Sequence, residues 1–99
     1  MIRSSELRAM ELPRLSGIGG FLRGPGFQVD EVDEVLRRSA DTLHAYEMGL
    51  SHSNMSVTSD DLVTQEFRYV RGSQGYDADA IDDLLERIIE QLREYEASS

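Results

Sequence analysis

The sequence contains no cysteine and no long run of apolar residues. Without cysteine, the chain can build neither a disulfide framework nor a thiolate metal site, so the redox state of the compartment does not matter to it. The first residues, "MIRSSELRAMELPRL", lack the apolar core of a signal peptide, and no stretch is long enough to span a bilayer. We therefore expect a soluble, cytoplasmic protein.

Positively charged residues are also scarce. The chain has ten arginines, no lysine and nineteen acidic residues, which gives a net charge of -9. Nucleic-acid phosphates require a basic face, so this balance disfavours a nucleic-acid partner. The acids crowd into two segments with helical patterning, whereas Arg14, Arg23, Arg68 and Arg71 precede those segments. A local basic patch can therefore survive within an acidic chain of 99 residues, which is long enough for one small domain or two half-domains with a shared core.

The chain carries an internal repeat. From Gly26 and Gly75 onward, "RGPGFQVDEVDEVLRRS" matches "RGSQGYDADAIDDLLERI" with a constant offset of 49 residues, which places Gly26 over Gly75 and Phe27 over Tyr76. Upstream, "SSELRAMELPRL" matches "SDDLVTQEFRYV", with Leu7 over Leu62. We therefore predict two copies of one unit, each made of a short helix, a glycine-rich loop and a long helix.

Apolar side chains in both long segments recur at alternating three- and four-residue steps, which predicts a narrow apolar stripe on each helix. Such stripes favour an all-α fold in which the two long helices pack as a short, coiled-coil-like pseudo-dimer. Ser39 is the polar interruption where the second copy has Ile88. The predicted helix-pair core consists of Val32, Leu36, Leu43, Ile81, Leu85, Ile88 and Leu92.

The boundaries follow from a polar stretch between the copies. We assign the first repeat to residues 1–50, a linker to 51–59 ("SHSNMSVTS") and the second repeat to 60–99. Nine extended residues span roughly 30 Å, and a helix of twenty residues has about the same length. The second copy can therefore return to the start of the first, which gives parallel long helices; an antiparallel pair is the second option.

Each long helix follows a glycine-aromatic turn, formed by Gly26 and Phe27 in one copy and by Gly75, Tyr76 and Asp77 in the other. We expect these glycines to adopt a backbone shape that other residues resist, and Asp77 to cap its helix. Gln28 holds the matching place and is a poorer cap, so Asp30 is the alternative.

The second copy resembles the N-terminal domain of the DivIVA family of bacterial cell-division and polar-growth scaffolds. The resemblance rests on Leu62, Phe67, Gly75-Tyr76-Asp77, Asp79, Ile81-Asp82 and Leu85. The copy departs from the pattern at Leu84, where the family usually has Phe, and at Ile81, where Val is commoner. The first copy fits more loosely, with Leu12 for the upstream Phe, Phe27 for Tyr, Gln28 for Asp and a longer loop.

The resemblance implies a parallel dimer with intertwined loops, in which an apolar residue flanked by basic ones at the loop tip inserts into membranes. A long coiled coil normally follows that domain and drives higher assembly, and from the sequence up to Ser99 we expect a protein without that assembly segment. By resemblance, the chain is a tandem of two DivIVA domains that folds as the equivalent of the dimer.

Sequence patterns typical of catalytic, metal-binding or phosphate-binding sites are weak in this chain. "DEVDE" and "DADAIDD" lack the alternating ligands and central glycine of an EF-hand, so helix-start acids explain them better than a metal site does. His44 and His52 have no accompanying metal motif, and "GIGGFLRGPG" lacks the order of a phosphate loop. We therefore expect no enzyme, and no catalytic, metal or cofactor residue or small-molecule substrate.

The loops are the predicted docking site, because each places two apolar residues beside an arginine: Phe21, Leu22 and Arg23 in the first copy, and Tyr69, Val70 and Arg71 in the second. The competing interpretation is that Phe21 or Tyr69 packs over the end of the helix pair. Our first functional hypothesis is a scaffold or adaptor that binds protein partners and itself, with the inner face of the cell membrane as a further docking surface. The alternative is a peripheral module whose loops insert into lipid.

Overall fold

The computed structural model describes residues 2–10, 26–50, 55–70 and 75–98. The fold is mostly helical, as predicted, with one small antiparallel sheet that was not expected. In chain order the elements are α1 (Ser4–Ala9), β1 (Gly26–Gln28), α3 (Val29–Glu47), α4 (Ser59–Val63), β2 (Tyr69–Val70), β3 (Gly75–Tyr76) and α5 (Ala78–Ser98).

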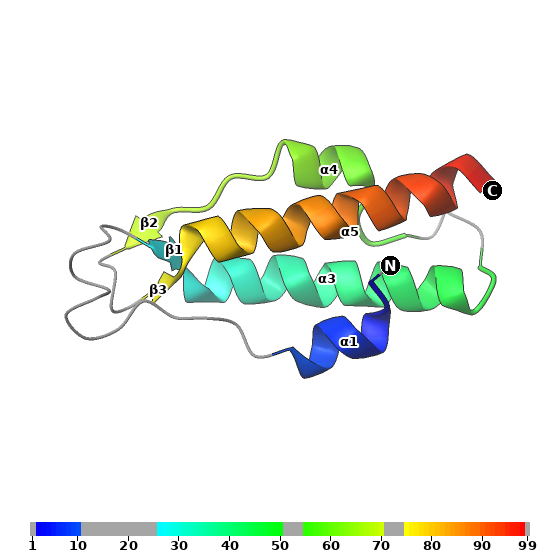
Figure 1. Cartoon of the computed structure of the whole chain (residues 1–99), viewed down its shortest axis with the longest axis horizontal. Coiled ribbons are helices and arrows are strands. Elements are labelled where there is room, and N and C mark those ends of the chain that lie inside the picture. The colour runs from blue at the N-terminus through cyan, green and yellow to red at the C-terminus, as the bar shows by residue number, and fades with distance from the viewer. Residues whose placement is uncertain (1, 11–25, 51–54, 71–74, 99) are drawn as a thin grey trace.

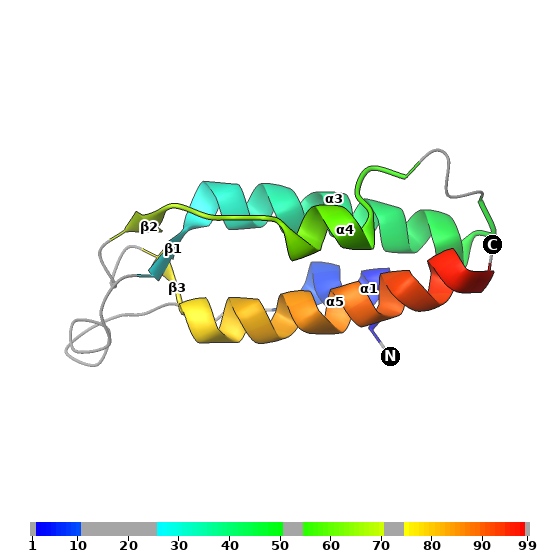
Figure 2. The ribbon, with the colours of Figure 1, turned by 90° about the horizontal axis from the view of Figure 1, so that it is seen from above.

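The long helices α3 and α5 lie side by side along the molecule, which measures 46 × 24 × 19 Å (Figure 1). Strands β1 and β3 are hydrogen-bonded to each other, and each leads directly into one long helix. The two helices therefore start at the same end and run parallel. The short helix α1 packs on α3 and α4 packs on α5, so each short helix covers the long helix of its own half (Figures 1 and 2).

Apolar stripes on the long helices supply most of the core. The stripe of α3 faces that of α5, and the short helices add Leu7 and Leu62, both of which are buried. Ser39 is fully buried on the stripe of α3, where its hydroxyl donates to the carbonyl of Val35 at 2.8 Å. A buried hydroxyl is costly only when it lacks a partner, so this polar interruption is tolerated. The residues of the expected helix-pair core are all buried: Val32, Leu36, Leu43, Ile81, Leu85, Ile88 and Leu92.

The sheet has the order β2-β1-β3, with β1 antiparallel to both neighbours. It occupies positions that the sequence indicated as glycine-rich loop and turn. The expected role of the glycines was wrong, because among the described residues only Gly49 has a positive φ. Gly26 and Gly75 instead permit a close approach of two strands: a Cβ at Gly26 would lie 2.6 Å from the carbonyl oxygen of Tyr76, and one at Gly75 would lie 2.7 Å from that of Phe27.

The residues just before α4 pack against the first long helix, although the sequence predicted a polar linker there. Val57 is buried, and its backbone N–H donates to the hydroxyl of Thr42 on α3 at 3.1 Å. Thr58 and Asp61 form a reciprocal capping box, so α4 begins at Ser59 rather than at residue 60. The described part of the expected linker 51–59 thus packs on the first long helix as well as connecting the two halves.

Candidate docking surface

The sheet closes the end of the helix pair, and an aromatic cluster lies on it. Phe27 is the centre of this cluster, with its ring centroid 5.1 Å from that of Phe67 and 5.4 Å from that of Tyr69. Phe67 is buried, but Tyr69 remains 65% exposed although one side of its ring packs on Phe27. The end of the molecule therefore presents a rigidly supported aromatic side chain to solvent.

The chain reaches this position by crossing between the halves. Helix α4 packs on α5, yet β2, only a few residues later, pairs with β1 of the first half. Arg68 anchors the crossing: its backbone N–H donates to the Glu31 carboxylate at 2.7 Å, and its carbonyl accepts from the N–H of Gln28 at 2.9 Å. Its guanidinium lies 3.5 Å from the same carboxylate and the Arg68 side chain is 84% exposed, so an ion pair between Arg68 and Glu31 lies at the surface just before β2.

Hydrogen bonds at the starts of the long helices hold the sheet against them. The hydroxyl of Tyr76 donates to the carboxylate of Asp33 on α3 at 2.6 Å, and this bond joins β3 to the other half. The side chain of Asp77 accepts from the N–H of Asp79 at 3.1 Å, as a cap should. In the first half Gln28 itself accepts from the N–H of Glu31 at 2.7 Å, so the expectation that Asp30 would replace it was wrong.

At the far end, each half is fastened by a serine and a glutamate. The backbone N–H and the hydroxyl of Ser4 both donate to the Glu47 carboxylate at 2.7 Å. Ser59 makes the same two bonds to Glu96, at 2.9 and 2.6 Å. The sequence analysis did not predict these contacts, although the predicted repeat contained the signal, since the offsets that align its two copies place Ser4 over Ser59 and Glu47 over Glu96.

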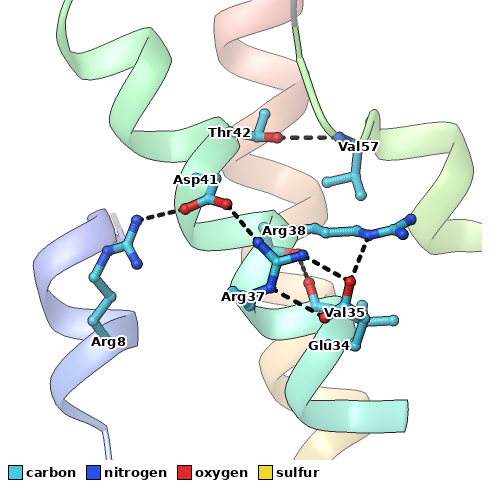
Figure 3. Close-up of polar contacts among 9 residues, drawn as sticks. Arg8, Glu34, Val35, Arg37, Arg38, Asp41, Thr42 and Val57 are labelled. Atoms are coloured by element: carbon cyan, nitrogen blue, oxygen red, sulfur yellow. Dashed lines mark hydrogen bonds and ion pairs between the residues drawn. The ribbon is translucent and has the colours of Figure 1, made fainter.

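An exposed ion network covers the outer face of the first half (Figure 3). Arg8 on α1 pairs with Asp41 at 2.8 Å, and Arg37 joins Asp41 to Glu34 at 3.1 and 2.7 Å. Arg38 also contacts Glu34, at 3.0 Å. The hydrogen bond from Arg37 is the main cause that lowers the pKa of Glu34 to about 2. About half of each of these side chains is exposed, and ion pairs at the surface contribute little to the free energy of unfolding. The pair between Arg8 and Asp41 links α1 to α3.

Only part of the predicted docking site can be placed. Tyr69 and Val70 form β2 at the sheet end, with Val70 half-buried. The sheet brings the turn residues of both halves together, since Phe27 is opposite Tyr76 in the register. Phe21, Leu22, Arg23 and Arg71 lie outside the described residues.

Metal-binding clusters and membrane-spanning helices are two features that the described residues do not form. Among them no cluster of three or more His, Cys, Asp and Glu side chains could hold a metal ion, and no helix is both long and apolar enough to cross a membrane. His44 is exposed on α3, and His52 lies outside the described part of the chain. Comparisons with family models, with curated proteins and with solved structures find no match for this chain.

Proposed function

We propose that this chain is a non-enzymatic scaffold or adaptor related to DivIVA, in which two tandem domains fold together as the equivalent of a two-chain pair. Its sheet end docks protein partners, and the loops that adjoin the sheet extend the docking surface. The observation that carries the proposal is Tyr69, a 65% exposed aromatic side chain on an edge strand, which a buried aromatic pair supports from below. Exposed aromatic residues on a rigid base are typical anchors of protein interfaces.

The duplication is supported by contacts between positions that the 49-residue offset relates. Phe27 is opposite Tyr76 in the sheet, and Tyr46 stacks on Tyr95 at the other end of the helix pair. A residue that meets its own counterpart lies on or near a two-fold axis. With one such contact at each end, the axis runs along the parallel helices, which is the arrangement that a DivIVA-like dimer has. The crossing of β2 onto β1 corresponds to the intertwining of that dimer.

Loss of partner binding on mutation of the sheet end tests the proposal. Tyr69→Ala, alone and with Phe21→Ala, should reduce the capture of protein partners by the immobilised full chain and leave the melting temperature nearly unchanged, because most of Tyr69 is exposed. Leu50→Ala is the matched control, since Leu50 is 54% exposed beyond the opposite end of α3. Capture that is unaffected by the double substitution would reject the sheet end as the docking surface.

A peripheral membrane module is the second candidate, because the side chains of Tyr69 and of the preceding residue Arg68 are both exposed, and aromatic and basic side chains are common at membrane interfaces. The net charge of -9 opposes binding to anionic lipid. Flotation with anionic phosphatidylglycerol vesicles at low and high salt separates the two functions. The scaffold should stay with the soluble fraction, whereas a membrane module should float and lose flotation in Tyr69→Ala.

A further inference from the structure

The two halves differ on the face where the short helix meets the long helix. In the second half an open groove of about 700 Å³ lies along the junction of α4 and α5. Leu62 and Leu85 form its buried floor, and Val63 and Ile89 add apolar surface, of which Val63 is 54% exposed. In Figure 1 α4 lies beside the middle of α5, which itself begins at the sheet end.

The corresponding face of the first half is covered by the pair between Arg8 and Asp41, which links α1 to α3. The alignment of the copies places Val63 at the position of Arg8 and Glu90 at the position of Asp41. The residue opposite Arg37 in the alignment is Glu86. The second half therefore has Val63 and Glu86 where the first half has Arg8 and Arg37, and it keeps an acid, Glu90, at the position of Asp41.

The rim of the groove is acidic. Asp82, Glu86 and Glu90 line it together with one cation, Arg93. Glu86 and Glu90 are one helical turn apart, and like charges at that spacing destabilise a helix. Within the described residues no hydrogen bond or ion pair engages any of these three carboxylates. Desolvation and the neighbouring charges of Asp79 and Asp83 raise the pKa of Asp82, as expected where negative charge lacks compensation.

We propose that the groove between α4 and α5 binds a basic peptide segment of a partner protein. One apolar side chain of the segment lies on Val63 and Ile89, and flanking Lys or Arg side chains pair with Glu86 and Glu90. The occupant is a cationic peptide because the groove combines an apolar floor with a rim of three carboxylates and a single guanidinium. This groove is formed by α4 and α5, whereas Tyr69 lies on the edge strand of the sheet. Binding in the groove therefore does not depend on binding at the sheet end.

Fluorescence anisotropy with a defined probe tests the site. The probe is a short fluorescein-labelled peptide with two leucines one helical turn apart and lysines at the remaining positions, titrated with the full chain. The same peptide with glutamates in place of the lysines is the reference. The lysine peptide should bind, and its affinity should fall as salt rises. Equal binding of the glutamate peptide would overturn the proposal.

Variants locate the binding. Glu86→Gln with Glu90→Gln should weaken binding about tenfold, the size expected when two exposed ion pairs are lost. Glu6→Gln with Glu94→Gln makes the same change in net charge elsewhere and should leave binding nearly unchanged. An equal loss in both double variants would mean attraction to the overall charge, and it would reject the groove.

A second variant copies the closed face of the first half. Val63→Arg places a guanidinium where Arg8 stands in the first copy, so it should pair with Glu90, cover the groove and abolish peptide binding without lowering the melting temperature. Tyr69→Ala should bind the peptide as the wild type does. Full binding by Val63→Arg, or loss of binding in Tyr69→Ala, would show that the peptide lies elsewhere.

Discussion

Tyr46 and Tyr95 stack with their ring centroids 4.8 Å apart and their planes 4° from parallel. The first ring belongs to α3 and the second to α5, near the ends of the helices that are remote from the sheet. Burial, followed by the nearby charge of Glu96, raises the pKa of the Tyr46 hydroxyl. The stack and the sheet thus join the same two helices at opposite ends.

A double-mutant cycle should detect the stack. Tyr46→Ala and Tyr95→Ala should each destabilise the fold, and the double variant should lose less than the sum, with a coupling of about 0.5 to 1.5 kcal/mol for stacked rings. Urea unfolding followed by circular dichroism measures the three values. Strict additivity would contradict a direct contact, and the pair Tyr46→Ala with Leu50→Ala serves as the control because Leu50 is exposed.

Alanine at either strand glycine should be destabilising. In Gly26→Ala and Gly75→Ala the added methyl group would lie 2.6 and 2.7 Å from a backbone oxygen, which cannot move as a side chain could. We expect a loss of about 1 to 3 kcal/mol for each, as for other overpacked sites. Gly49→Asn is the control, since no atom lies within 4 Å of a Cβ placed at position 49 and asparagine tolerates the positive φ of Gly49. Wild-type stability of both alanine variants would refute the close strand contact.

Core truncation should cost far more than surface truncation. Leu43→Ala removes a fully buried side chain from α3, so we expect a loss of about 2 to 5 kcal/mol in the free energy of unfolding. Leu50→Ala removes the same atoms from a position that is 54% exposed, and the expected change is within about 0.5 kcal/mol. Thermal melts of the two variants give the comparison. Similar melting temperatures would exclude a core centred on Leu43.

Acid should weaken the contact between Ser4 and Glu47. Burial would raise the pKa of Glu47, but the two hydrogen bonds from Ser4, together with the electrostatic effect of Arg3 and His44, bring the pKa below its ordinary value of 4.5. A carboxylate with a lowered pKa in the folded state stabilises the protein above its unfolded pKa and ceases to do so as pH falls through the folded pKa. The stability difference between wild type and Glu47→Gln should therefore be largest near neutral pH and shrink below pH 4.5. A difference that stays constant on acidification would exclude this linkage; Glu6→Gln, on exposed α1 surface, is the control.

One chain should suffice for folding. The halves share a core, so the melting temperature should not change on dilution, whereas an obligate dimer would melt at lower temperature when dilute. Light scattering over the same concentrations gives the mass. A melting temperature that falls steadily with dilution would argue for pairing between chains instead of within one.

The helical part of this fold could be predicted because its signals extend over many residues. Three- and four-residue steps persist along α3 and α5, and apart from Ser39 they place apolar residues such as Leu43 and Leu92 on the inner face. The cap at Asp77 could be predicted for a related reason, since Asp before an apolar-periodic segment has a local partner.

The sheet and the long-range polar contacts could not be predicted in the same way. Strands of two or three residues are too short to display a two-residue period, and glycines such as Gly26 indicate a turn as readily as a close strand contact. The bonds from Ser4 to Glu47 join residues far apart in the chain, and exposed serines and glutamates carry no pattern that names a partner. The loop half of the candidate site, from Phe21 to Arg23, remains a prediction.

Strand β1 has both of its neighbours in the second half of the chain, β2 on one side and β3 on the other. During synthesis the first fifty residues therefore leave the ribosome with no strand for β1 to join and with the buried face of α3 uncovered. The three-stranded sheet can form only after Tyr76, the last residue of β3, has been synthesised. We therefore expect the N-terminal half to fold only together with the second half. A protein cut between the halves should consequently yield two fragments that are each unfolded and that regain structure only when mixed.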